Sequence, residues 1–419
     1  MTSSSTDQPA KVKMVEILVN DEDIIGMFVD IEIFENIFIG GITGSITIMD
    51  SDSQNFIEKN NIEFIEDISF TFVDNNGVEL KFEGHMNGLR NEITKNQVKM
   101  YTVDFTSKAV RKNEMTFVSK AFRNISPEEI TRSMVEKKLD GKLILSKNHS
   151  NGQPMTWVAG NRKPIDIIRY VLNHGISMDG DPQYNKSQGT SSGSSGFLCW
   201  ETLDGYRFSS MGNLLKEGNF SDTHEKYANY IANMPSSKES KLKTIMAYDF
   251  PKVGDFFEKL RSGAVKSNHV SFDTDTGIMT NFTYNATTKE VTQKVLDKTT
   301  DTSRTIMKMY TNEKFKNDCV REERDTGDQS RMYLSQTIAK QNTFCDIQGR
   351  ITLAAQYNLR AGDLIDIKIY KLQYQDSDKE PQKKHSGIYL ISQVGHHFFR
   401  SGYSYTKLAL IRTNIQQTQ

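Results

Sequence analysis

Short runs of β-branched and aromatic residues, separated by turn-forming residues, fill the first quarter of the chain. These apolar runs cover residues 14–19, 24–25, 28–34, 37–39, 44–50, 68–73, 80–82 and 98–105. Such spacing, about ten residues from one run to the next, is typical of antiparallel barrels and sandwiches. We therefore predict a β-barrel over residues 12–112. Its clearest hairpin turn is Asn75-Asn76-Gly77, because the Asn-Gly pair readily adopts the positive φ values of a tight turn.

Helical spacing replaces this strand pattern after residue 121. Ser126 suits an N-cap, Pro127 the first helical position, and Glu129 the return contact of a capping box. The apolar residues that follow recur at helical spacing, namely Ile130, Met134, Val135 and Leu139, and Gly141 is placed to stop the helix. The pattern predicts one helix between these signals.

A second helix is predicted to begin at Pro164 and to end by Gly175. Its expected apolar face consists of Ile165, Ile168, Val171 and Leu172. The Ser/Gly-rich stretch 185–196 is predicted to be a mobile loop, and 197–208 a hairpin that turns at Asp204-Gly205. Residues 113–235 therefore form a predicted α/β lobe.

Strand-like alternation returns in the rest of the chain, in two separated parts. We predict a second barrel from residues 236–262 and 342–413, interrupted by an inserted lobe at 263–341 that ends in a helix over 329–341. Within the barrel, Ile365, Ile367 and Ile369 share one strand face, and a turn is expected around Gly395. Residues 1–11 are expected to be disordered, and 414–419 to be a tail. The predicted fold class is mainly β (α+β).

Composition narrows the functional classes. The 419 residues are 37% apolar and 25% charged, with 52 Lys+Arg against 53 Asp+Glu, a balance that argues against a general nucleic-acid binder. Apolar runs stay well short of the roughly 18 residues of a membrane span, and the N-terminus lacks a signal-peptide core, so no membrane insertion is expected. The three cysteines lie far apart, which favours synthesis in a reducing interior over a disulfide or zinc framework.

Motifs of nucleotide binding, metalloprotease and serine-hydrolase chemistry are missing from the sequence. The adjacent histidines, His396 and His397, should point to opposite faces of a strand, which does not suit one metal ion. The pairs Phe256-Phe257 and Phe398-Phe399 would each turn one ring outward if they lie in strands, as candidate subunit contacts. We expect no enzyme activity, cofactor, metal or catalytic residue.

The C-terminal residues also carry a resemblance. They read Leu-x-x-Gly-Asp-x-Ile, a charged loop, Gly-x-Tyr-x-Ile-x-x-Val-x-His-x-Phe, and Tyr-x-x-Leu-x-Leu. The matching residues are Leu359, Gly362, Asp363, Ile365, Gly387, Tyr389, Ile391, Val394, His396, Phe398, Tyr405, Leu408 and Leu410. In this order the set resembles the closing barrel of the central baseplate hub of contractile-tailed bacteriophages, a family shared with the hub modules of contractile injection systems.

The resemblance implies two tandem barrels similar to tail-tube subunits, with smaller α/β lobes between and within them. It implies a homotrimer in the virion's tail baseplate, made in the host cytoplasm, that adapts a sixfold tail tube to a threefold spike. Expected partners are the tube or tube-initiator proteins, a trimeric spike, the surrounding baseplate proteins, and phage DNA only in transit through the lined channel. Two alternatives remain: the hub of a bacterial contractile injection system, and a β-rich glycan-binding or glycan-hydrolysing protein.

Overall fold

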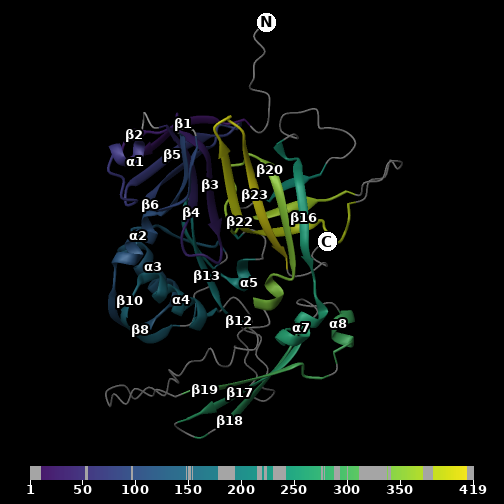
Figure 1. Ribbon diagram of the computed structural model, residues 1–419. Coiled ribbons are helices and arrows are strands. Elements are labelled where there is room, and N and C mark those ends of the chain that lie inside the picture. The colour runs from purple at the N-terminus through teal and green to yellow at the C-terminus, as the bar shows by residue number, and fades with distance from the viewer. Residues whose placement is uncertain are drawn as a thin grey trace, which may run out of the picture.

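The computed structural model describes most of the chain (Figure 1). The described residues are 11–51, 55–95, 98–147, 149, 152, 154–177, 194–214, 219–220, 224–229, 242–274, 277, 279–286, 293–299, 301–310, 337, 341–370 and 381–412. The predicted disordered segment 1–11 lies outside them except for Lys11, and the predicted tail 414–419 lies wholly outside.

Strands dominate, which confirms the mainly β fold class, and most strands of the largest sheet pair antiparallel. The strands are β1 (Lys13–Val19), β2 (Glu22–Asp23), β3 (Phe28–Asn36), β4 (Thr43–Ser51), β5 (Asp67–Val73), β6 (Glu79–Lys95), β7 (Val98–Ser107), β8 (Val118–Ile125), β9 (Leu143–Leu145), β10 (Met155–Arg162), β11 (Ile176–Ser177), β12 (Ser194–Ser195), β13 (Phe197–Thr202), β14 (Gly205–Ser210), β15 (Glu225–Ala228), β16 (Ile245–Val253), β17 (Lys266–Asp273), β18 (Met279–Asn285), β19 (Arg304–Tyr310), β20 (Ile347–Ala354), β21 (Leu364–Lys368), β22 (Gly387–Phe399) and β23 (Ser404–Arg412). The helices are α1 (Phe56–Lys59), α2 (Lys108–Met115), α3 (Pro127–Lys138), α4 (Pro164–His174), α5 (Met211–Leu214), α7 (Phe256–Ser262) and α8 (Gln293–Asp297).

One 13-stranded sheet contains the first strand, β1, and the last strand, β23. Its order is β16-β20-β23-β22-β3-β4-β7-β6-β5-β1-β2, with β21 also paired to β22 and β15 paired to β21. We call β1–β7 the first half-sheet, and β15, β16 and β20–β23 the second half-sheet. The long strand β22 joins them, because it pairs with β3 of the first half-sheet as well as with β21 and β23. The two halves lie side by side in the upper part of Figure 1.

Each half-sheet curls back on itself, but neither is laddered into a closed barrel within the described residues. The start of β1 returns to the β22–β23 turn through one bridge, Lys11 to Tyr403. The start of β16 returns to the end of β15 through another, Ala228 to Thr244. Two hydrophobic cores accompany this arrangement, one mainly in each half-sheet. The first includes Phe70, Phe72 and Phe105, and the second includes Ile365, Ile367 and Ile369 as the sequence predicted.

The lobe, defined here as α2–α5 and β8–β14, lies beside the first half-sheet and below it in Figure 1. Both predicted helices are present. Ser126 caps α3, where its Oγ accepts a hydrogen bond from the backbone N–H of Glu129 at 3.3 Å. In α4 the prediction missed Ile167, which is fully buried, whereas Ile165 and Leu172 are only half-buried.

Some local predictions were wrong. The turn predicted around Gly395 is absent, and β22 continues through this residue. The glycine instead makes room for the Phe34 ring, which would lie 2.8 Å from a Cβ at this position. Phe256 and Phe257 lie in α7 rather than in a strand, since the Asp255 side chain caps a helix there through the N–H of Glu258. Phe257 is 65% exposed.

Two further predictions need adjustment. The hairpin β13–β14 turns at Leu203 and Asp204, and Gly205 already pairs with Thr202 in the ladder. Of the predicted mobile loop 185–196, residues 185–193 lie outside the described part, and Ser194–Ser195 pair with β11 as a short strand. Of the predicted helix 329–341, Thr337 and Gln341 are described and are helical.

The inserted sheet, β17–β19, is separate from the large sheet. It lies at the bottom of Figure 1, reached from β16 through α7. Its central strand β17 pairs antiparallel with β18 and parallel with β19. The sequence did not predict β19, because Arg304–Tyr310 lies in a stretch dominated by charged and polar residues. No helix among the described residues combines the length and apolar character needed to cross a bilayer.

Candidate functional site

Three parts of the chain meet in a buried, charged junction. Glu35 comes from the end of β3, the hairpin β13–β14 supplies Trp200, Asp204 and Arg207, and the loop before β21 supplies Arg360 to Asp363. The loop and the hairpin lie more than 150 residues apart in sequence. We call this set of residues the junction, because it connects both half-sheets and the lobe.

Glu35 is the innermost charge of the junction, with 1% of its surface exposed. Its two carboxylate oxygens accept backbone hydrogen bonds from Leu203 and Ala361, each at 2.9 Å. Burial raises the pKa of Glu35, and the nearby guanidinium of Arg360 partly opposes this rise. One side chain thus holds the hairpin and the loop against the first half-sheet.

Arg360 extends the junction from the interior to the surface. Its guanidinium makes two 3.1 Å hydrogen bonds to the carboxylate of Asp204, a geometry typical of arginine. It also donates to the carbonyl of Tyr357 at 2.6 Å, and its Nε lies 3.8 Å from Glu35. Because Arg360 is 8% exposed, these contacts replace most of its hydration.

A second ion pair fixes the loop before β21. Arg207 donates to Asp363 at 2.7 Å and to the Ala361 carbonyl at 3.0 Å, and the indole N–H of Trp200 donates to the same carbonyl. Gly362 has a φ of +91°, and a Cβ there would stand 2.4 Å from the Trp200 ring. Only glycine fits this combination of backbone and contact.

Glu201 attaches the hairpin to the first half-sheet at a second point. Its Oε2 accepts hydrogen bonds from the Ile42 backbone N–H at 3.0 Å and from Ser107 Oγ at 2.5 Å. Burial raises the pKa of Glu201 to about 7, and the nearby Glu35 adds to the rise. The carboxyl therefore titrates near neutral pH.

The charged groups of the junction bind other parts of the same chain. The carboxylate oxygens of Glu35 and the donors of Arg360 are bonded to protein groups that come from separate segments. Such an arrangement specifies one relative placement of the half-sheets and the lobe. The resemblance had singled out Gly362 and Asp363, whereas Glu35, Glu201, Asp204, Arg207 and Arg360 were missed. The sequence did contain a signal for Glu35. In β3 this residue continues the alternation of the inward-facing residues Ile31 and Ile33, two positions apart, so its side chain should also point inward.

The histidine pair lies in β22 and is buried on both sides of the strand. His396 Nδ1 lies 3.1 Å from Thr406 Oγ1, whereas His397 stacks on Tyr405 at 4.7 Å and meets the Phe34 ring edge-on. Burial lowers the pKa of His396 to about 3 and that of His397 to about 4. Phe398 points into the first core and Phe399 is half-buried. Across the described residues, no cluster of three or more His, Cys, Asp or Glu side chains could hold a metal ion.

Comparison with known proteins gives a result at the level of structure. No protein family and no curated protein matches the sequence. The structure is similar to the 43 kDa tail protein of prophage MuSo2 from Shewanella oneidensis, with a TM-score of 0.54, 10% identity, and coverage of 97% of this chain and 99% of that one. It is also similar to a tail protein from Neisseria meningitidis MC58, with a TM-score of 0.55, 8% identity, and coverage of 97% and 98%.

At these identities the likeness concerns the fold. It extends over nearly the whole length of all three chains, so it includes both half-sheets, the lobe and the inserted sheet. The resemblance to tail proteins that the C-terminal residues suggested is therefore confirmed as a likeness of fold: this chain folds as those two tail proteins do.

Proposed function

We propose that this chain is the central hub of a contractile phage tail baseplate, a structural subunit that acts as a homotrimer and has no catalytic role. The observation that carries the proposal is the fold, shared with two tail proteins over 97% of this chain. The junction supports it, because a hub must transmit force between its parts without changing their relative placement. The ionic groups of the junction are engaged with protein partners, which suits a structural role.

Each chain would contribute two tube-like units, residues 12–112 and residues 236–262 with 342–413. Three such chains present six units in a ring, so that a threefold trimer can seat a sixfold tube above and hold a trimeric spike below. The lobe and the inserted sheet would face other baseplate proteins. Support for this division comes from the two hydrophobic cores and the two curled half-sheets. The channel of this ring would pass phage DNA in the assembled virion.

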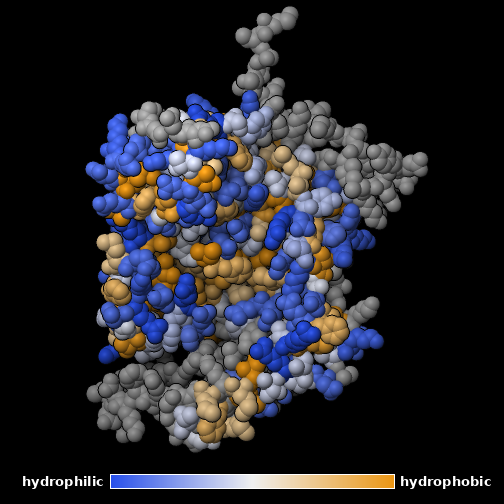
Figure 2. All heavy atoms as spheres, in the orientation of Figure 1, coloured by the Kyte–Doolittle hydropathy of each residue, from blue (hydrophilic) through white to orange (hydrophobic). Residues whose placement is uncertain are grey.

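The inserted sheet carries the surface best suited to a subunit contact. Phe272, Met279, Met307 and Met309 share one face of it, and the last three are 65%, 75% and 77% exposed. Figure 2 shows this apolar patch at the bottom of the molecule, over β17–β19. Exposed methionine-rich faces of this kind usually mark interaction sites.

The first experiment is light scattering on the purified chain, alone and with a candidate trimeric spike protein. We expect a particle of three chain masses, formed alone or on addition of the spike. The double variant Met307→Lys/Met309→Lys should lower the trimer fraction while circular dichroism stays unchanged. The matched control is Met49→Lys/Met100→Lys, which changes two exposed methionines on paired strands of the first half-sheet.

A chain that stays monomeric beside the spike would refute the hub proposal. A trimer that resists the β17–β19 variant would refute only the placement of the contact. Antibody labelling of purified virions then tests the location, since a hub should be found at the baseplate end of the tail. Labelling of a bacterial injection particle instead would select the alternative hub.

A further inference from the structure

The lobe carries two surface hollows that meet at one exposed aromatic ring. The first, of about 530 Å³, is lined by residues of the β10–α4 corner and of α4, including Arg162, Lys163 and Arg169. The second, of about 410 Å³, lies between β8 and the end of α3 and includes Lys120, Lys137 and Lys138. Phe117 lines both and is 59% exposed.

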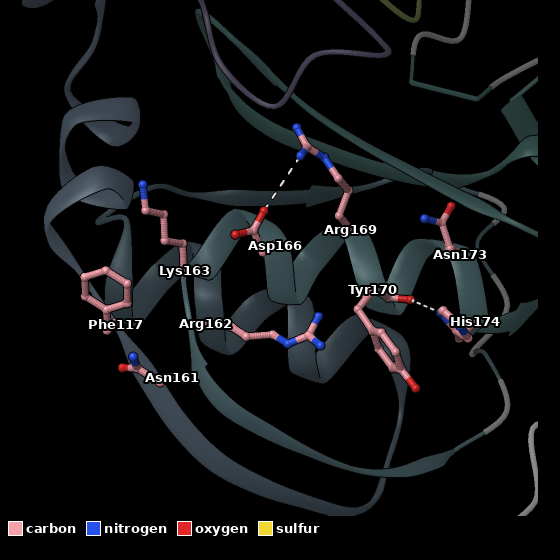
Figure 3. Close-up of a pocket in the computed structure, with 9 residues that line it drawn as sticks. All are labelled: Phe117, Asn161, Arg162, Lys163, Asp166, Arg169, Tyr170, Asn173 and His174. Carbon is pink, nitrogen blue, oxygen red and sulfur yellow. Dashed lines mark hydrogen bonds and ion pairs between the residues drawn. The ribbon is translucent and has the colours of Figure 1, made fainter. Parts of the chain in front are cut away.

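The two hollows form one surface, because the backbone N–H of Asn161 in the first donates to Ser119 Oγ in the second at 3.0 Å. Figure 3 shows the first hollow, with Phe117 and Lys163 at one end and Tyr170 and His174 at the other. Arg162 lies between these ends, with its guanidinium 5.6 Å from the Trp157 ring and 5.9 Å from the Tyr170 ring. Those contacts hold the charge in place without neutralising it.

The charge of this surface is strongly positive in a chain whose net charge is only −1. The second hollow is lined by three lysines and no carboxylate, and the first by three cations and the single carboxylate of Asp166. Lys163 pairs with Glu114, and Arg169 lies 3.7 Å from Asp166. Lys120, Lys137, Lys138 and Arg162 are exposed and have no ion-pair partner within the described part of the chain.

From this geometry we propose that the hollows bind an acidic, extended segment of a partner protein. An apolar side chain of that segment would pack on Phe117, and its carboxylates would contact the cations of the two hollows. Each hollow has room for a few residues. The carboxylates of Glu114 and Asp166 on the first rim would repel an unbroken row of phosphates, whereas a peptide can space its charges around them. The proposal does not depend on the hub function or on trimer formation.

The test uses fluorescence anisotropy at low salt with the full chain and a labelled, end-capped peptide, Glu-Glu-Phe-Glu-Glu-Phe. The charge-inverted peptide Lys-Lys-Phe-Lys-Lys-Phe and a thymidine hexanucleotide are the comparison probes. We expect the acidic peptide to bind most tightly, and Lys137→Glu/Lys138→Glu to weaken it about tenfold. The matched control reverses the charge of two exposed lysines outside the lobe, in Lys13→Glu/Lys59→Glu on β1 and α1, and should leave binding within about twofold.

The apolar contact has its own test. Phe117→Ala should weaken the phenylalanine peptide about fivefold and leave a Glu-Glu-Ser-Glu-Glu-Ser peptide unchanged. Thermal unfolding checks that each variant is folded, which is expected because every substituted residue is exposed. The proposal is overturned if the acidic peptide binds no better than the basic one, or if the hexanucleotide binds more tightly than the acidic peptide. It is also overturned if Lys137→Glu/Lys138→Glu weakens binding of the acidic peptide no more than the control variant does.

Discussion

Glu201 is a buried acid that should make the stability of the protein depend on pH near neutrality. Its pKa rises from 4.5 to about 7 on folding, so the folded state binds more protons than the unfolded state between these values. Its stabilising contribution is therefore complete below pH 4.5 and is lost as the pH rises through 7. Gln in its place keeps the neutral form at every pH.

We expect Glu201→Gln to be more stable than the wild type by about 1–2 kcal/mol at pH 8 and nearly equal to it at pH 5. Urea unfolding at both pH values measures this difference. Glu79→Gln, at an exposed position of β6, should change stability by less than about 0.5 kcal/mol at either pH. Equal effects of Glu201→Gln at pH 5 and pH 8 would contradict the assignment.

Gly362 is the second residue on which the junction depends. A side chain there meets a left-handed backbone of φ +91° and the Trp200 ring at 2.4 Å. We expect Gly362→Ala to lower the free energy of unfolding by about 2–4 kcal/mol, as the strain and overpacking costs add. Denaturant unfolding measures this free energy. The control is Gly160→Ala, because an added Cβ there meets nothing within 4 Å. Similar small effects of the two variants would show that the loop before β21 relaxes freely.

At the scale of the element, β22 is the strand that joins the two half-sheets into one sheet. It carries the buried residues His396 and His397, and burial holds their pKa values far below the ordinary 6.5. Unfolding lets His396 bind a proton, so the folded state loses stability as the pH falls below about 6.5 towards the folded pKa of this residue.

His396→Gln should weaken this acid sensitivity. Between pH 6.5 and 4.5 we expect the wild type to lose about 2 kcal/mol more than the variant, because a neutral side chain removes one coupled protonation. Urea midpoints of both proteins across this interval measure the difference. The midpoints at pH 7.5, where His396 is neutral in both states, give the packing cost of the substitution alone. Parallel pH curves for the two proteins would count against His396 as the group responsible.

At the scale of the whole molecule, Arg360 couples parts that are distant in sequence. Arg360→Leu leaves the buried Glu35 without its compensating charge, and we expect a loss of about 3–5 kcal/mol. Hydrogen exchange should rise together in β3, β13 and the loop before β21. Glu35→Gln/Arg360→Leu should recover part of the loss, since no charge is then stranded, but the NH2 group of Gln cannot accept one of the two backbone hydrogen bonds that Glu35 accepts.

Arg350→Leu is the control for this series, because Arg350 is exposed on β20 of the same half-sheet. It should change stability by less than about 0.5 kcal/mol. A faster exchange confined to the loop before β21 after Arg360→Leu would mean that Arg360 does not couple the half-sheets.

Local signals in the sequence determined the elements of this protein. The Asn76-Gly77 turn, the Ser126 cap of α3 and the inward face of Ile365, Ile367 and Ile369 were all predictable, because each depends on residues within one turn or one strand. The order of C-terminal residues also pointed to the tail-protein fold. In α7 the Asp255 cap outweighed the strand-like look of Phe256-Phe257.

Only the tertiary structure decided how these elements combine. Nothing local in β22 specifies that it pairs with β3, since strand pairing depends on contacts between residues more than 350 positions apart. In the sequence, Glu35, Asp204 and Arg360 look like ordinary charged surface residues. Only folding brings their side chains together and displaces most of the water around them. Gly395 looks like a turn in sequence, but the ring of Phe34 gives it another role, because packing against a distant strand outweighs its local preference.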